Sequence, residues 1–284
     1  LSRDERGFPG PFGSNPIGAY GGVDGVSRGV NDTRQVGARL DHPWSRRIRQ
    51  RLDASYTNLS GDFTSPYGTS SSGTHRFDAR VQDDVSLTTK LGGSVGLEVQ
   101  HESGSSTYIT GGTSSPLPIR RNVAGAYGEL RYSAADRLFL TGGLRIEHIT
   151  RDAVEANLAG YSPRPVFPDQ TVNSANPKIS LSYLLTNPGS TRSGRSTRLR
   201  ASAGTGIRPP DAFEIAFTNN PNLKPERSRS VDGGVEQQFA GGAYVLGATA
   251  FLNRYDDLIV AVGTSFRDAK ERMRLAAPGG RVGH

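Results

Sequence analysis

The sequence predicts an all-β protein, an antiparallel transmembrane β-barrel of which the chain holds a part. Apolar and polar residues alternate with period two over long stretches, several of which exceed ten residues, and the connections between them are short and long in turn. Outer-membrane strands need about 9–11 residues to cross a bilayer. Barrels of this class join their strands by short periplasmic turns and long extracellular loops.

The alternation justifies each predicted strand, because period two places one set of side chains on each face. Even positions of residues 138–147 are apolar or glycine, and odd positions of 94–100 and of 178–183 are apolar. The pattern indicates about eleven strands, near residues 31–41, 47–60, 74–88, 92–102, 119–133, 138–150, 174–186, 196–206, 228–240, 243–255 and 258–266.

The connections are the second signal. Short ones are expected near 42–46, 89–91, 134–137, 187–195 and 241–242, and long ones near 61–73, 103–118, 151–173, 207–227 and 256–257. The short ones are compact, as tight hairpins require, and the long ones are rich in Gly, Ser, Thr, Pro and Asn. Aromatic residues are expected near strand ends, where either an interfacial girdle or simple strand propensity would place them: Trp44, Tyr56, Tyr132, Tyr183, Phe239, Tyr244 and Tyr255.

The composition fits a barrel better than a soluble core. Only 34% of the 284 residues are hydrophobic, whereas 36 are glycine and 17 are proline. A barrel with a wet lumen needs only alternate residues to be apolar. The net charge is +7, and all basic residues are arginine except Lys90, Lys178, Lys224 and Lys270. Because the arginines mostly alternate with apolar residues, they favour a solvated lumen and rim, and no nucleic acid partner is expected.

The two ends of the chain do not alternate. Residues 1–30 are predicted to be a loop or linker region, residues 31–266 the partial barrel, and residues 267–284 an irregular tail. The loss of period after residue 266 suggests a truncated or frame-shifted terminus. With no cysteine in the chain, disulfides and thiolate metal sites are excluded.

No catalytic motif is present, so we expect no enzyme, no cofactor and no metal site. The five histidines, His42, His75, His101, His148 and His284, lack metal-ligand spacing. Asp256 and Asp257 could attract calcium, but two acids do not supply the six to eight oxygens that calcium prefers. Four loop aromatics could touch a ligand at the mouth, with none favoured individually: Tyr67, Tyr108, Tyr161 and Phe217.

The charged positions of the strands form a group. If the apolar set faces lipid, these side chains face inward, where charges of both signs suit a wall that packs on a polar plug or lines water. They are Arg51, Asp53, Asp78, Arg80, Glu98, Glu129, Arg131, Arg145, Glu147, Asp232 and Glu236. The pattern favours structural contacts over a single substrate site.

A family resemblance rests on residues 204–262. The segment Gly206-Ile207-Arg208-Pro209-Pro210 precedes Asn220-Pro221-Asn222-Leu223-Lys224-Pro225-Glu226, and residues 251–259 read Phe-Leu-Asn-Arg-Tyr-Asp-Asp-Leu-Ile. Prolines at these places exclude a central strand and indicate a long external loop. The whole resembles the barrel of TonB-dependent outer-membrane receptors, over roughly residues 20–266.

The resemblance implies a twenty-two-stranded barrel with an N-terminal plug, in the outer membrane of a Gram-negative bacterium. It also implies TonB-energised import of a scarce, bulky ligand of the iron–siderophore or cobalamin class. The expected partners are outer-membrane lipid, the chelate ligand, and the TonB complex acting through a plug that this sequence lacks. The alternatives are a passive porin or an adhesin-type barrel, and, as a third class, a soluble β-rich lectin or enzyme.

Overall fold

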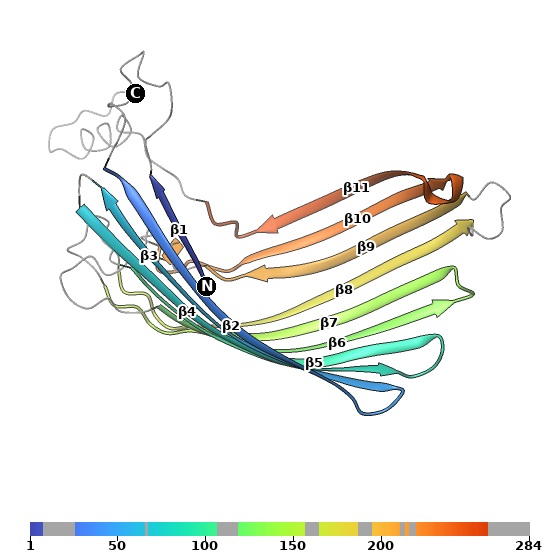
Figure 1. Ribbon diagram of the computed structural model, residues 1–284, viewed down its shortest axis with the longest axis horizontal. Coiled ribbons are helices and arrows are strands. Elements are labelled where there is room, and N and C mark those ends of the chain that lie inside the picture. The colour runs from blue at the N-terminus through green and yellow to red at the C-terminus, as the bar shows by residue number, and fades with distance from the viewer. Residues whose placement is uncertain are drawn as a thin grey trace, which may run out of the picture.

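The chain forms one antiparallel sheet of eleven strands, arranged side by side in sequence order (Figure 1). The computed structural model describes residues 1–7, 26–65, 68–106, 119–156, 165–186, 195–210, 214–215 and 220–260. The strands are β1 (Ser2–Gly7), β2 (Arg28–Pro43), β3 (Ile48–Ser65), β4 (Gly68–Ser86), β5 (Leu91–Ser106), β6 (Ile119–Ala134), β7 (Leu138–Arg151), β8 (Gln170–Thr186), β9 (Ser196–Arg208), β10 (Glu226–Phe239) and β11 (Tyr244–Asp256).

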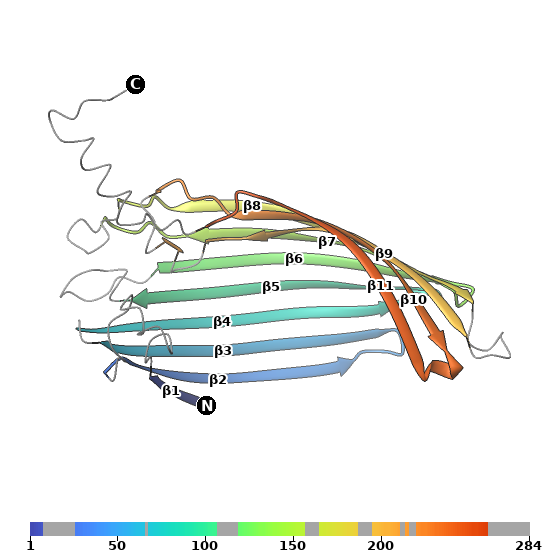
Figure 2. The ribbon, with the colours of Figure 1, turned by 90° about the horizontal axis from the view of Figure 1, so that it is seen from above.

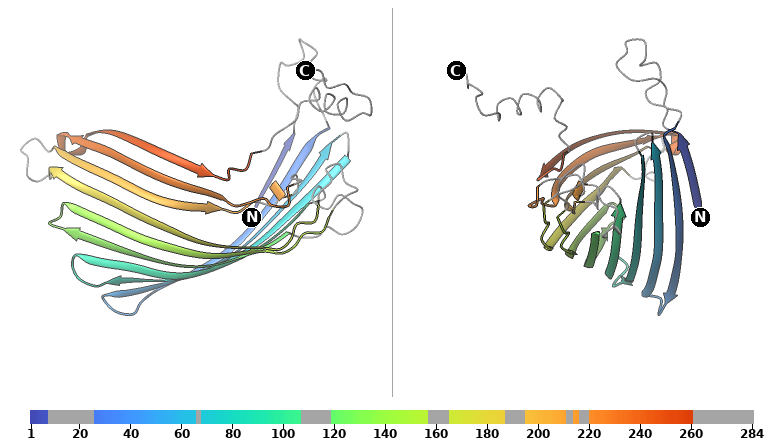
Figure 3. Two further views of the ribbon diagram at one scale, coloured as in Figure 1. Left: turned by 180° about the vertical axis from the view of Figure 1, so that it is seen from behind. Right: turned by 90° about the vertical axis from the view of Figure 1, so that its left-hand side faces the viewer.

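The sheet is twisted and curved into an open trough. Figure 2 shows β2 to β7 running nearly parallel to one another in projection, with β9 to β11 crossing at the far end. The right panel of Figure 3 looks along the sheet and shows its two rims, β1 on one side and β11 on the other. Each strand is rotated by a small angle relative to its neighbour, and this rotation accumulates across any large sheet. The trough therefore has an inner and an outer face.

The register assigns every strand residue to one of these faces. Arg39, Asp53, Arg80 and Glu98 are directly opposite one another on β2 to β5, so they share the face that we call inner. The predicted set of charged strand residues lies entirely on this inner face, which confirms the predicted alternation.

The outer face is a band of exposed apolar side chains. On β5, for example, Val95, Leu97 and Val99 are 57%, 60% and 52% exposed. Among the described residues, few hydrophobic side chains are buried, and all of them except Leu184 lie at the long-loop edge of the sheet. An apolar face of this extent, with polar residues behind it, fits a protein that is solvated by lipid on one side.

Two short turns confirm their predicted compactness. Residues 135–137 join β6 to β7, with Ala135 and Asp136 at φ 50° and 53°. The short 3-10 helix η3 (Ala240–Gly242) joins β10 to β11, with Gly241 at φ 68°. Backbones with positive φ match the twist of the strands they join.

Three predictions about the elements were wrong. β3 and β4 extend to Ser65 and from Gly68, so no long loop spans 61–73. The paired segments there consist mostly of Gly, Ser and Thr, with Phe63 as the one large apolar residue among those described, and alternation fails as a signal. Ser2–Gly7, expected to be loop, pairs with β2. Residues 258–260 form no strand, and the remainder of the predicted strand 258–266 lies outside the described residues.

Candidate functional site

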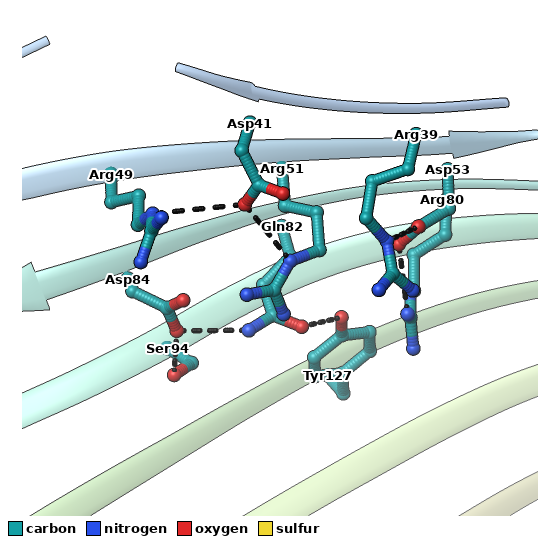
Figure 4. A network of polar contacts seen from close by, with 10 residues as sticks. All are labelled: Arg39, Asp41, Arg49, Arg51, Asp53, Arg80, Gln82, Asp84, Ser94 and Tyr127. Atoms are coloured by element: carbon teal, nitrogen blue, oxygen red, sulfur yellow. Dashed lines mark hydrogen bonds and ion pairs between the residues drawn. The ribbon is translucent and has the colours of Figure 1, made fainter. Parts of the chain in front are cut away.

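The inner face carries a network of ion pairs and hydrogen bonds. Asp53 lies between two arginines, with its carboxylate oxygens 2.5 Å from Arg39 Nε and 2.9 Å from Arg80 Nη2 (Figure 4). Asp41 is 3.3 Å from Arg51 Nε and 3.6 Å from Arg49 Nε. Each contact joins neighbouring strands: Arg49 is a diagonal neighbour of Asp41, and the other pairs are directly opposite, where side chains in an antiparallel pair lie close together.

A second group of contacts skips a strand. The Tyr127 hydroxyl on β6 donates to Gln82 Oε1 on β4 at 2.8 Å, and Gln82 Nε2 donates to Asp84 at 2.8 Å (Figure 4). Arg145 on β7 reaches Glu98 on β5 and also contacts Glu147 at 3.0 Å. Side chains that meet across an intervening strand tie the wall together beyond its backbone ladder.

The position of the Tyr127 ring depends on the absence of a side chain at Gly96. Gly96 is directly opposite Tyr127 in register, and a Cβ at Gly96 would lie 2.4 Å from the tyrosine ring. The ring therefore lies across β5 toward Gln82. An aromatic side chain that covers a strand glycine is a recognised device for closing such a gap.

Two described residues of the segment between β9 and β10 contact the inner face. Arg121 on β6 donates to the Pro210 carbonyl at 3.4 Å, and Gln170 on β8 donates to the Leu223 carbonyl at 3.2 Å. Both donors are on the inner face, so Pro210 and Leu223, near the two ends of this segment, lie on that side of the trough. Beneath it is a small apolar core whose side chains are at most 5% exposed: Ile119, Val154, Phe167 and Ile215.

Arg208, the last residue of β9, clamps this loop at both ends. Its guanidinium donates to both oxygens of Glu226, at 2.7 and 2.8 Å, and to both oxygens of Glu214, at 2.7 and 3.1 Å. The Ile259 N–H also donates to Glu226, at 2.7 Å, and so the segment after β11 is held by the same group. Bidentate arginine–carboxylate pairs are strong and directional.

The clamp shifts the acid–base behaviour of its members. The two residues lie at the long-loop ends of their strands, Arg208 as the last residue of β9 and Glu226 as the first of β10. Arg208, and after it the Ile259 N–H, lowers the pKa of Glu226 to about 2. The pKa of Arg208 is raised by the hydrogen bonds to Glu226 and Glu214. The Arg208 guanidinium and the Glu226 carboxylate are therefore both ionised at neutral pH.

The sequence-derived candidates fall in different places. Tyr67, Tyr108, Tyr161 and Phe217 lie outside the described residues, as does His284. The other histidines contact polar or aromatic side chains, and the described residues contain no group of three metal-ligating side chains. Asp256 is 3.3 Å from Arg254 and 4.0 Å from Arg229, so its carboxylate is paired with arginine.

Sequence reasoning missed the role of the loop residues. Glu226 ends the quoted motif and Glu214 lies between its two halves, but nothing in their spacing revealed that one arginine binds both. Ile215 offered a signal, because an isolated large apolar residue in a polar loop needs a place to bury its surface. Phe167, only 1% exposed, follows a proline-rich stretch and carried the same signal.

The chain is similar to known proteins over most of its length. The family described as "TonB dependent receptor-like, beta-barrel" matches residues 2–272. No curated protein matches the chain in sequence. No helix among the described residues is long and apolar enough to cross a membrane.

Solved structures share the fold at low sequence identity. The hemophore receptor HasR of Serratia marcescens, in complex with its hemophore HasA and heme, is 16% identical, with a TM-score of 0.62 over 81% of this chain and 40% of its own. The copper transporter OprC is 17% identical, with a TM-score of 0.63 over 82% and 40%. The alcaligin receptor FauA from Bordetella pertussis is 18% identical, with a TM-score of 0.58 over 86% and 40%. The chain thus spans about 40% of the length of these neighbours.

Proposed function

The chain belongs to the TonB dependent receptor-like β-barrel family. From that premise we propose that it forms barrel wall of an outer-membrane receptor that imports a scarce, bulky ligand with energy from the TonB complex. The observation that carries the proposal is the family match over residues 2–272. A plug in addition to these residues would receive the pull of TonB, and the rest of the barrel would complete the wall.

The two faces of the sheet support this assignment. The outer face is apolar enough to contact lipid of a Gram-negative outer membrane, and the inner face carries charges of both signs. An inner wall whose charges are largely paired within itself suits a polar plug that packs against it and is later displaced. The role requires no catalytic residue.

We propose a metal-bearing chelate of the iron–siderophore or cobalamin class as cargo. Support comes from the structural neighbours, whose names include heme, copper and alcaligin. The edge of the sheet at which the Arg208 clamp holds Glu214 and Glu226 is where such a cargo would be captured first.

Uptake in the native host tests the proposal. Cells with and without the gene receive a ⁵⁵Fe-labelled hydroxamate siderophore, a ⁵⁵Fe-labelled catecholate siderophore, or ⁵⁷Co-cyanocobalamin. We expect deletion to lower uptake of one probe at least tenfold, and a protonophore to cause the same loss in the parent strain. Uptake that needs the gene but survives the protonophore would establish a passive porin instead. Unchanged uptake of all three probes would refute the proposed cargo class.

A further inference from the structure

The seam between β8 and β9 is paired over only part of its length. The ladder covers Lys178–Thr186 of β8 and begins at the Lys178–Gly204 pair. Beyond that pair, toward the long loops, residues 170–177 pair with β7 alone and residues 205–208 with β10 alone, as far as the described residues go. Figure 1 shows β8 staying beside β7 in this part, whereas β9 leaves it. The backbone ladder of the wall is therefore split at its long-loop end.

Pro177 explains why the ladder ends where it does. The Pro177 carbonyl oxygen lies on the β9 side, 3.5 Å from the position that a Cβ on Gly204 would take. The N–H and C=O of a strand residue point to the same side, so the donor that proline lacks would have faced β9. The Thr205 backbone, next along β9, therefore finds no N–H at Pro177, and the two strands part at this level.

The long-loop end of β9 is fixed to β10 instead of β8. Arg208 and Glu226 are directly opposite in register and share two hydrogen bonds. The same guanidinium binds Glu214, and the Ile259 N–H after β11 donates to Glu226. The ends of three strands and the segment between β9 and β10 are thus joined in one unit. We call this unit the flap, and its described residues are 205–210, 214–215, 220–229 and 254–260.

Side chains hold the flap to the wall in place of a backbone ladder. Gln170 on β8 donates to the Leu223 carbonyl at 3.2 Å, and the Thr205 hydroxyl donates to Asn176 at 3.4 Å. Ile215, only 2% exposed, is the flap's member of the small apolar core. Separate side-chain contacts of this kind can break without disturbing the strands on either side.

We propose that the flap is a hinged gate, which turns at the level of Pro177 and opens the wall along the β8–β9 seam. Two glycines of β9 lie at the hinge, Gly204 and Gly206, and glycine within a strand often marks a bend. Collective hinge motions of packed elements take microseconds to milliseconds. An open gate would admit a bulky cargo to the inner face; this role, unlike the hinge itself, rests on the function proposed above.

Spin labels on cysteine pairs test the hinge, since the chain has no cysteine of its own. Thr171→Cys with Arg227→Cys reports across the seam on the long-loop side of Pro177. Tyr183→Cys with Val235→Cys reports across the same strands on the other side. We expect pulsed EPR in outer-membrane vesicles to give two distances for the first pair and one for the second. A single narrow distance for both pairs would overturn the hinge.

Pro177→Thr supplies the missing N–H and should extend the ladder. We expect it to lower the open population up to about tenfold, as one added backbone hydrogen bond would. Ala175→Thr is the matched control, because it adds the same side chain on the same face without a new donor, and it should leave the distances unchanged. Ile215→Ala removes the apolar anchor and should raise the open population. Equal effects of Pro177→Thr and Ala175→Thr would overturn the hinge.

Uptake in the native host separates the gate from the hinge. Pro177→Thr should lower energised uptake by up to about the same factor, since capture through one conformation scales with its population, and Ala175→Thr should leave uptake unchanged. Unchanged uptake in a Pro177→Thr strain whose distances have narrowed would overturn the gate. Uptake that does not depend on the gene for any probe would refute the proposed cargo, and the EPR distances would still decide the hinge.

Discussion

At the scale of single residues, the inner wall depends on where side chains are absent as much as on where they meet. Gly96 gives Tyr127 the space to cross β5 and reach Gln82, and that hydrogen bond links β6 to β4. The same strand carries Glu98 for Arg145. β5 is therefore bridged twice by side chains that belong to its neighbours.

Replacing Gly96 with alanine should displace the Tyr127 ring and break its bond to Gln82. A core site that gains a methyl group it cannot accommodate costs about 1–3 kcal/mol, and we expect a loss of this size in the free energy of unfolding by urea in lipid micelles. Gly142→Ala is the control, because a Cβ there has nothing within 4 Å. Equal effects of the two variants would show that the ring does not need the space.

Glu226 makes the clamp sensitive to acid. Its folded pKa of about 2 lies below the unfolded value of about 4.3, so the carboxylate stabilises the fold above pH 5 and this contribution disappears as the pH falls toward 2. We expect Glu226→Gln to lower the free energy of unfolding by about 2 kcal/mol at pH 7. The difference from wild type should shrink at pH 3, and a difference that grew on acidification would contradict the clamp.

At the scale of elements, the two positive-φ turns show how the hairpins are closed. Ala135 and Ala240 adopt φ of 50° and 49°, which costs an L-residue about 1–2 kcal/mol in left-handed backbone. Neither turn contains the Asn-Gly pair that this geometry favours.

Ala135→Gly should therefore stabilise the protein by about 1 kcal/mol, because glycine has no Cβ to strain at positive φ. Ala243→Gly is the matched variant: its φ is −62°, and glycine there only adds freedom to the unfolded chain. Urea midpoints should move in opposite directions. A shift in the same direction would indicate that the 135–137 turn relaxes to another conformation.

Most of the sheet was predictable from the sequence, and the errors share one cause. Alternation located the stretches near 92–102, 138–150 and 243–255, because each has lipid-like surroundings on one face only. It failed at 61–73, where the residues of β3 and β4 are mostly Gly, Ser and Thr and little contrast in polarity between alternate positions remains. β1 is too short to alternate recognisably.

The candidate site was less predictable than the strands. Inner-face charges were identified as a group, because the face on which a strand residue lies follows from the local alternation of the sequence. Their partners were not, because Arg145–Glu98 and Arg208–Glu214 depend on curvature and loop path. The signature around Arg208-Pro209-Pro210 marked the place without revealing that its arginine binds two carboxylates.

At the scale of the whole molecule, the apolar outer face of the sheet suits lipid and the polar inner face suits water. Two adjacent residues can test this assignment. Val99 faces outward and Gln100 inward, next to Asp78 and Glu98. An arginine on a lipid face costs about 2–4 kcal/mol near the bilayer midplane. We expect Val99→Arg to lose roughly that much free energy of folding into liposomes, whereas Gln100→Arg should be nearly neutral. Equal losses would refute the assignment of the faces.

The short first strand has a consequence for how such a sheet is assembled. β1 pairs with β2 only from Arg28 to Thr33, so the backbone groups of residues 34–43 on that rim face no described strand, and no described strand pairs with the far side of β11. In hydrocarbon each such group costs several kcal/mol. We therefore expect the unpaired rims to limit entry into a bilayer. Until other strands pair with β2 and β11, these edges should favour edge-to-edge association with further strands.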